Sequence, residues 1–379
     1  MEVYLDNSAT TKPYDEVVKT MSDVMSSTYG NPSSLHRMGK QAEDSLTKSR
    51  ETLAKSIGCQ TGEFYFTSGG TESNNLAIIG YVAANKREGR RIITQPTEHA
   101  AVLEPFKYLE TQGFEVCYVP VDSSGFPDIE KLKELINDET ILLSFMYVNN
   151  ENGAIFPIEE IARVKRGKAA LHVDAVQAYG KLPINVKKQN IDMLSLSSHK
   201  IHGPNGIGGL YVKNNLKITP IVYGGSQEKA LRSGTENIAS ASAFAKASEI
   251  KIAKLEEDAL KMQNLKSRLK DKLLAGIENV VINSPENSVC SILNVSFPGV
   301  KSEVLLHVLE SKGIYVSTGS ACNSKKKKFS YVLKEMGLKD NVIDSAVRFS
   351  FSSFNTEEEI DYTADVLIKE IPVLRKIMR

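Results

Sequence analysis

The alternation of short apolar segments with helical patterns between residues 62 and about 215 is the strongest constraint on the fold. The segments are near-continuous apolar runs, among them 91–95 (RIITQ), 140–148 (TILLSFMYV), 169–176 (AALHVDAV), 191–197 (IDMLSLS) and 208–212 (GGLYV). Strands that are apolar on both faces are typical of a mostly parallel sheet covered by helices on both sides. The sequence therefore predicts an α/β fold with its ligand site beyond the carboxyl ends of the strands.

The rest of the chain has a different order of elements. A long helical pattern at 236–275 leads into a region that reads strand, strand, helix, loop, helix, strand, helix, which is typical of a smaller α+β domain. A chain of 379 residues is also too long for one ordinary hydrophobic core. We therefore predict a large domain at 15–250 and a smaller domain that combines 1–14 with 251–379.

The composition of the chain argues against several classes of protein. The net charge of +1 gives no reason to expect a nucleic-acid or membrane-surface protein. No apolar run reaches the roughly 20 residues that cross a bilayer, and the start (MEVYLDNSATTKP) lacks the apolar core of a signal peptide, so we expect a cytoplasmic protein. The cysteines form no CxxC pair, which argues against a disulfide framework or a zinc site; they are Cys59, Cys117, Cys290 and Cys322. Cys322 differs from the others because it lies in a stretch of small and polar residues, STGSACNS, followed by Lys325 to Lys328.

Two predicted strand ends carry reactive side chains. Asp174 follows one strand in HVDAVQ, and Lys200 follows another in SLSSHK. A buried lysine is biased toward its neutral amine, which is the form that makes Schiff bases. A fixed carboxylate is what keeps the pyridinium nitrogen of pyridoxal phosphate protonated. This pair alone does not identify a site, because lysine and aspartate are common residues.

A phosphate site is also predicted. In FTSGGTESNN a strand meets Gly69, Gly70 and Thr71 before a helix begins, and backbone N–H groups at such a helix start bind phosphate. An ordinary glycine turn with a threonine cap would have the same pattern. In LRSGTEN, Thr235 is either a further phosphate ligand or the N-cap of the following helix.

Ten motifs in this order resemble the cysteine desulfurases of the NifS/IscS type, within the fold-type I pyridoxal-phosphate enzymes of the class V aminotransferase branch. They span residues 4 to 351 and read YLDNSATT, GNPSS, FTSGGTESNN, TEHAAV, YVNNENG, HVDAVQ, SLSSHKIHGPNGIGGLYV, RSGTEN, GSACNS and VRFSF. The resemblance implies a large domain with a mostly parallel seven-stranded sheet and a smaller α+β domain. Serine in DNSATT and glycine in SGGT depart from the usual alanines, and both are small-for-small changes.

The resemblance assigns roles to individual residues. It implies that Lys200 forms the Schiff base with pyridoxal 5′-phosphate, that Asp174 binds the ring nitrogen, and that Gln177 binds the phenolic oxygen. His99 matches the imidazole stacked on the ring, although it could instead only cap a helix. The matching phosphate ligands are Thr71, Ser197, His199 and, from a second subunit, Thr235, so the resemblance implies a homodimer. Gly70 is a further predicted cofactor-binding residue, through the backbone of the glycine turn.

The substrate and the reaction also follow from the resemblance. Arg348 matches the arginine that holds the substrate carboxylate; the alternative for Arg348 is a salt bridge at a strand edge. Asn150 matches a residue that faces the cofactor ring and the substrate, and Asn31 matches one that lines the substrate end of the site. The implied reaction takes sulfur from L-cysteine, leaving L-alanine and a persulfide on Cys322, for an acceptor in iron–sulfur cluster assembly or tRNA thiolation. Selenocysteine lyase, another class V aminotransferase and a non-catalytic pyridoxal-phosphate scaffold are the alternatives.

The four lysines after Cys322 depart from the family, whose members usually have small, apolar or acidic residues there. They could form a solvated stretch, a docking site for an acidic acceptor, or a source of positive charge that lowers the pKa of Cys322. Exposed charges are screened beyond about 8–10 Å, so the third effect should be modest.

Overall fold

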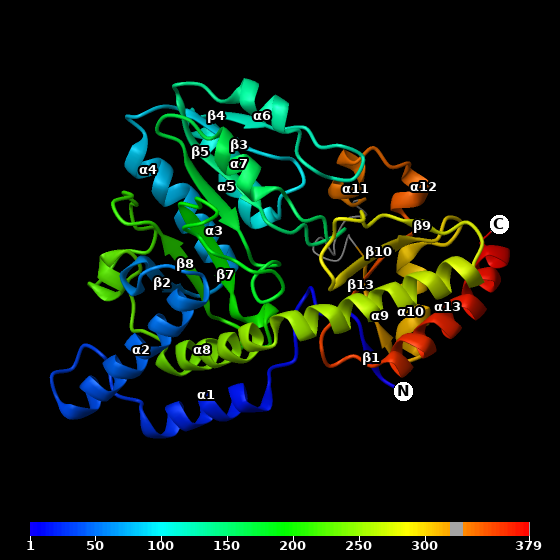
Figure 1. The fold of residues 1–379 in the computed structure, drawn as a ribbon, viewed down its shortest axis with the longest axis horizontal. Helices are drawn as coiled ribbons and strands as arrows, with labels where there is room; N and C mark the ends of the chain where they lie inside the picture. The colour runs from blue at the N-terminus through cyan, green and yellow to red at the C-terminus, as the bar shows by residue number, and fades with distance from the viewer. Residues whose placement is uncertain (319–328, 379) are drawn as a thin grey trace.

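The computed structural model describes residues 1–318 and 329–378 (Figure 1). The predictions made for Cys322 and for Lys325 to Lys328 therefore fall outside the described residues. No helix in the described ranges is long and apolar enough to cross a membrane.

The larger sheet has seven strands in the order β2, β8, β7, β6, β5, β3, β4. Strand β8 is antiparallel to both of its neighbours, and every other neighbouring pair is parallel, so the predicted α/β fold is confirmed. The bounds are β2 Phe64–Thr67, β3 Arg91–Thr94, β4 Glu115–Tyr118, β5 Thr140–Met146, β6 Ala170–Asp174, β7 Met193–Ser197 and β8 Gly208–Val212.

Helices cover both faces of this sheet because its buried strands present apolar side chains to each side (Figure 1). Leu142 packs in one core with Tyr81 and Phe106, whereas the next residue, Leu143, belongs to the second core with Phe244. The helices of this part are α1 Asp15–Ser27, α2 Arg37–Ser56, α3 Gly70–Asn75, α4 Tyr81–Asn85, α5 Ala100–Thr111, α6 Ile129–Leu135, α7 Ile158–Val164 and α8 Ile238–Ala253. A π-helical turn, Leu76–Gly80, joins α3 to α4.

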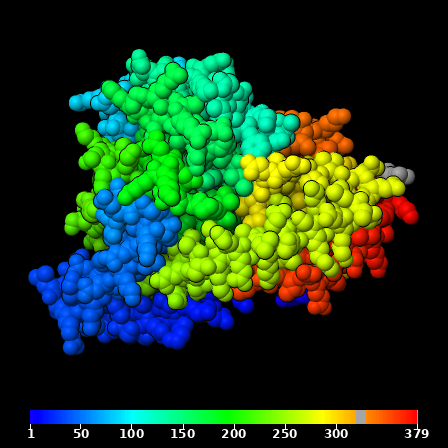
Figure 2. Space-filling model, in the orientation of Figure 1, coloured from blue at the N-terminus to red at the C-terminus, as the bar shows by residue number. Residues whose placement is uncertain are grey.

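The predicted long helix at 236–275 is two helices, α8 and α9 (Leu255–Gly276), which meet at Lys254. Lys254 has ψ of 15° and does not continue α8. Glu256, Glu257 and Asp258 then form an acidic first turn, which favours the start of a new helix through its dipole. In the space-filling view α9, coloured yellow-green, extends the surface of α8 toward the C-terminal part of the chain (Figure 2).

The C-terminal part is built on a four-stranded antiparallel sheet in the order β12, β13, β10, β9. Its elements are β9 Val281–Ile282, β10 Ile292–Ser296, α10 Ser302–Ser311, β12 Ser317–Thr318, α11 Tyr331–Glu335, α12 Asp340–Ile343, β13 Ala346–Ser350 and α13 Glu357–Ile377. The domain boundaries predicted from the sequence stay a prediction.

The first residues of the chain connect the two parts. Strand β1 (Val3–Tyr4) pairs in parallel with β11 (Ile314–Tyr315). A few residues later the backbone N–H of Thr11 donates to the carbonyl of His199, at 3.0 Å. The segment between them, including Ser8 and Ala9, is thereby held beside Lys200.

Candidate active site

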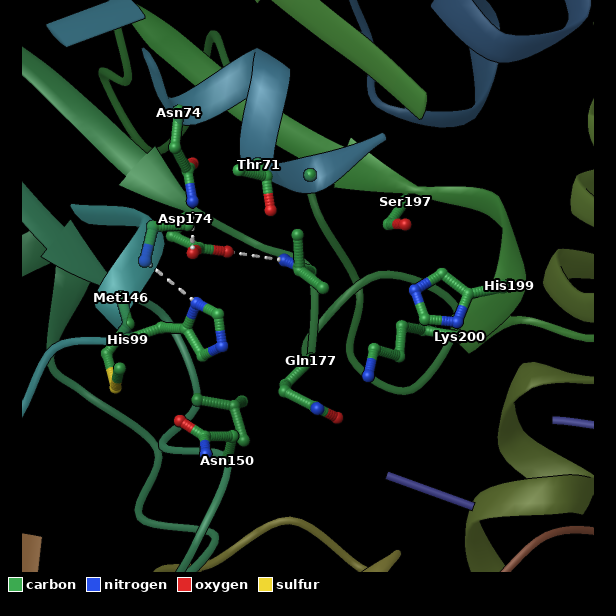
Figure 3. Close-up of a pocket in the computed structure, with 14 residues that line it drawn as sticks. Thr71, Asn74, His99, Met146, Asn150, Asp174, Gln177, Ser197, His199 and Lys200 are labelled. Atoms are coloured by element: carbon green, nitrogen blue, oxygen red, sulfur yellow. Dashed lines mark hydrogen bonds between the residues drawn. The ribbon is translucent and has the colours of Figure 1, made fainter. Parts of the chain in front are cut away.

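A cavity opens at the carboxyl ends of β5, β6 and β7, where the sequence predicted the ligand site (Figure 3). The structure brings together there every predicted cofactor-binding residue except Thr235: Gly70, Thr71, His99, Asn150, Asp174, Gln177, Ser197, His199 and Lys200. These residues come from separate strand ends, two helix starts and the loop after β5. The cavity is therefore assembled by tertiary packing rather than by one local motif.

Asp174 ends β6 and is held by a donor on each carboxylate oxygen. Asn74 Nδ2 donates to Oδ2 at 2.7 Å, and the backbone N–H of Val176 donates to Oδ1 at 3.0 Å (Figure 3). Asp174 is buried, so these bonds fix the orientation of its carboxylate against the cavity. Sequence reasoning gave Asn74 no role, although it lies inside the quoted motif FTSGGTESNN.

His99 is both a helix cap and a wall of the cavity. It is the N-cap of α5, and its Nδ1 accepts a hydrogen bond from the backbone N–H of Ala101 at 3.1 Å. Burial, together with the positive charge of Lys200, lowers the pKa of His99 against the opposing effect of Asp174. The ring is therefore neutral, with its proton on Nε2 because Nδ1 is an acceptor.

Lys200 ends the short 3-10 turn after β7. Its Nζ donates to the carbonyl oxygens of Ser8 at 2.5 Å and Ala9 at 2.6 Å. Gln177 Nε2 donates to the same Ser8 carbonyl at 3.0 Å. The motif YLDNSATT thus supplies backbone acceptors to the site, a function that its sequence did not reveal.

The glycine turn before α3 forms a close-packed cradle. Gly69, the N-cap of α3, has φ of 153°, a conformation that favours glycine. A Cβ on Gly208 would lie 2.6 Å from the Cα of Gly69, so the two backbones are too close for side chains. Glu72 in this turn pairs with Arg232 at 2.8 Å, which ties the motif RSGTEN to the cradle.

Arg348, on β13, lies behind Asn150 and is buried. Its Nη1 donates to the carbonyl of Asn150 at 2.8 Å and its Nη2 to Asp6 Oδ1 at 2.9 Å. The salt bridge considered as an alternative for Arg348 is therefore present, and its role toward a substrate carboxylate stays a prediction. Nε of Arg348 and Oδ1 of Asn150 are buried without a hydrogen-bond partner among the described residues.

Two other predicted residues lie elsewhere. Thr235 lines a separate cavity with Gly206 and Arg232 rather than the cavity of Lys200. Asn31 is exposed in the loop before α2, where its Oδ1 accepts from the backbone N–H of Ser33 at 2.9 Å. Within one subunit, neither residue contributes to the main cavity.

Two buried carboxyl groups next to the site were not identified from the sequence. Burial raises the pKa of Glu98 to about 8 and that of Glu151 to about 7. Glu98 Oε1 accepts from Gln95 Nε2 at 2.9 Å and from the backbone N–H of Met146 at 2.7 Å, while its Oε2 has no partner among the described residues. Glu98 is therefore largely protonated at neutral pH.

The chain is similar to known proteins over nearly its full length. The aminotransferase class-V family matches residues 3–363. The cysteine desulfurase IscS of Methanosarcina thermophila is 43% identical over 376 residues, covering 99% of this chain and 93% of that protein. The cysteine desulfurase IscS of Dictyoglomus turgidum is 41% identical over 378 residues, covering 99% of this chain and 96% of that protein.

The chain is also similar to solved structures over nearly its full length. A NifS-like protein superimposes with a TM-score of 0.93 at 40% identity, covering 98% of this chain and 100% of that chain. SspA in complex with cysteine superimposes with a TM-score of 0.82 at 32% identity, covering 93% of this chain and 100% of that chain.

Proposed function

Because this chain belongs to the cysteine desulfurases of the aminotransferase class-V family, we propose that it takes sulfur from L-cysteine and passes it through Cys322 to an acceptor protein. Enzymes of this family depend on pyridoxal 5′-phosphate. The observation that carries the proposal is that Lys200 and Asp174 line one cavity together with His99.

The residues of the cavity fit this cofactor. Asn150 Oδ1 is a buried polar atom without a partner among the described residues, as expected where a polar ligand binds. The cradle at Gly69 and Gly70 offers backbone N–H groups at the start of a helical run, which suits a phosphate. The cavity also combines an amine, a carboxylate held by two donors, and a neutral imidazole.

Each residue has a proposed task in the reaction. The bound cofactor supplies an electron sink for the charge that develops at the substrate Cα. Lys200 would then remove the Cα proton, and Asp174 would hold a proton on the ring nitrogen. Arg348 would hold the substrate carboxylate through its guanidinium, whose Nε is unpaired among the described residues.

Cys322 is the proposed acceptor of the substrate sulfur, as the resemblance implied. Its thiolate would bond to the substrate sulfur as the carbon–sulfur bond breaks, so that cysteine and one thiol give alanine and one persulfide. The acceptor remains either an iron–sulfur scaffold or a tRNA-thiolation enzyme. The lysines at 325–328 are the proposed place to look for its docking site.

We also propose that the enzyme is a homodimer with shared sites. Thr235 is a predicted phosphate ligand, yet in one subunit it lies outside the cavity of Lys200. The neighbouring segment exposes Tyr223, with 77% of its surface accessible, as would suit a contact with a second copy. Mixing a Lys200→Ala chain with a Thr235→Ala chain tests this, because only a shared site would regain activity in the mixture.

The decisive test of the reaction uses the purified holoenzyme with L-cysteine and a reductant. Sulfide and alanine are measured for the native chain, for Cys322→Ser, and for Cys117→Ser as a control that removes a different thiol. We expect alanine and sulfide from the native chain and the control, and neither from Cys322→Ser. Equal alanine from all three would refute persulfide formation on Cys322.

A further inference from the structure

Lys181 is a buried lysine directly behind the wall of the cofactor cavity. It follows Gly180 in AYGKLP and is only 7% exposed. Its Nζ donates to Gln177 Oε1 at 3.0 Å, and Gln177 lines the cavity itself. Nothing in the sequence motifs gave this lysine a role.

The two partners of Gln177 fix the orientation of its amide. The backbone carbonyl of Ser8 can only accept, so Nε2 must face Ser8 and Oε1 faces Lys181, whose amine donates to it. One N–H of Nε2 is used by Ser8, and the second has no acceptor among the described residues. In Figure 3 this amide extends toward the amine of Lys200 at the edge of the cavity.

The charges around Lys181 do not explain why a lysine is buried there. Among the described residues no carboxylate pairs with it, whereas the nearby Lys251 has its own partner, Asp258, at 2.5 Å. Burial and the neighbouring cations lower the pKa of Lys181 to about 7. The charged or titratable groups that interact with Lys181 are Lys200, Lys251, Arg348, Cys290, His199 and His202.

The charged form of a buried amine that lies among other cations is stabilised when an anionic ligand atom comes close. The cavity ligand in the proposed function carries an acidic ring oxygen, and the free N–H of Gln177 is a suitable donor to it. Lys181 is not among the residues that line the cavity, and it bonds to Gln177, which is, so its influence on such an oxygen would pass through the Gln177 amide.

We propose that Lys181 is a positioning residue for the cofactor, which locks the Gln177 amide with its N–H toward an anionic ring oxygen. This inference rests on the proposed function, because it assigns Gln177 to that oxygen. It makes Lys181 part of the cofactor-binding machinery without direct contact with the cofactor.

The test compares the native holoenzyme with Lys181→Met, which keeps the length and apolar stem of the side chain. Lys266→Met is the matched control, since Lys266 is equally buried and donates to neutral groups, Ser288 Oγ and the carbonyl of Val289. The readouts are the cofactor dissociation constant and the pH midpoint of the cofactor's visible absorbance. Neither readout is an activity, and a merely structural loss would not shift the midpoint.

For Lys181→Met we expect about fivefold weaker cofactor binding, the usual effect of losing one hydrogen bond. The pH midpoint should move upward, because the Gln177 N–H that Lys181 orients toward the ring oxygen favours the less protonated form. In a Gln177→Ala background the same substitution should change neither quantity. Lys266→Met should match the native enzyme.

An unchanged midpoint and affinity in Lys181→Met would overturn the inference. An equal effect in the Gln177→Ala background would also overturn it, because Lys181 would then not act through the amide. If the native protein binds no pyridoxal phosphate and shows no visible band, the proposed function itself fails.

Discussion

Glu98→Gln tests whether a carboxyl group beside the cavity is neutral in the folded protein. Glu98 Oε1 accepts two hydrogen bonds, and Oε2 has no partner among the described residues. Glutamine keeps the accepting oxygen and places its NH₂ at the position of Oε2, as the protonated acid places its OH. The variant therefore reproduces the protonated form of Glu98 at every pH.

The expected magnitude follows from the pKa of Glu98, which burial raises from 4.5 to about 8. A group whose pKa is higher in the folded state than in the unfolded state stabilises the fold fully at pH values below the unfolded-state pKa. This stabilisation is lost as the pH rises to the folded-state pKa. Between these two pKa values the unfolding free energy of the native protein falls by about 1.4 kcal/mol per pH unit relative to that of the variant. Between pH values of about 5.5 and 7.5 the difference in unfolding free energy should grow by about 2.7 kcal/mol.

Thermal unfolding of both proteins at the two pH values measures this difference. For a chain of this length, about 2.7 kcal/mol corresponds to a melting-temperature difference that widens by about 3 °C in favour of Glu98→Gln. Glu104→Gln is the matched control, since Glu104 is an exposed glutamate on the following helix whose side chain is 66% accessible. A gap between Glu98→Gln and the native protein that does not change with pH would mean that Glu98 is ionised in the folded state, and the reasoning from its burial would be refuted.

Three further predictions concern the cavity. Asp174→Asn should reduce alanine formation on the order of 100-fold, as loss of a preorganised charge does, with Asn74→Ala showing a smaller loss in the same assay. His99→Ala should lower stability by about 1 kcal/mol through loss of the α5 cap, whereas His99→Asn should restore the cap but not the activity, as measured by unfolding and alanine release. Gly69→Ala should weaken cofactor binding, because alanine does not readily adopt the φ of 153° that this turn requires. Gly167→Ala is the control: Gly167 also has a positive φ, 59°, and open space where a Cβ would lie, and the substitution should leave the cofactor dissociation constant unchanged. If Gly69→Ala and Gly167→Ala weaken binding equally, the cradle is not the phosphate site.

The sheet and the strand-end residues could be predicted because their signals are local. Continuous apolar runs marked the strands; Asp174 is the last residue of β6, and Lys200 lies three residues after the end of β7. Parallel strands place their carboxyl ends at one edge, so these residues had to meet. The resemblance added roles that this argument from position does not supply.

Other parts of the site depend on contacts between residues far apart in the chain. Lys200 bonds to carbonyls 192 and 191 residues earlier in the sequence, and no periodicity reports such a contact. Glu98 and Lys181 look like ordinary charged residues until tertiary packing buries them. The break between α8 and α9 was missed because both helices share one continuous helical pattern around Lys254.

The pairing of β1 with β11 has a consequence for how the protein is made. Val3 pairs with Ile314, so on the ribosome the early strand must wait until its partner has been synthesised. At typical elongation rates of about 5–20 residues per second, the wait is roughly 15–60 s. Ser8 and Ala9, which accept from Lys200, lie just after that strand and before the contact with His199. The pairing that holds this segment from its N-terminal side is therefore made only after residue 315 of 379 has been synthesised, and cofactor capture is expected to be a late event in the synthesis of the chain.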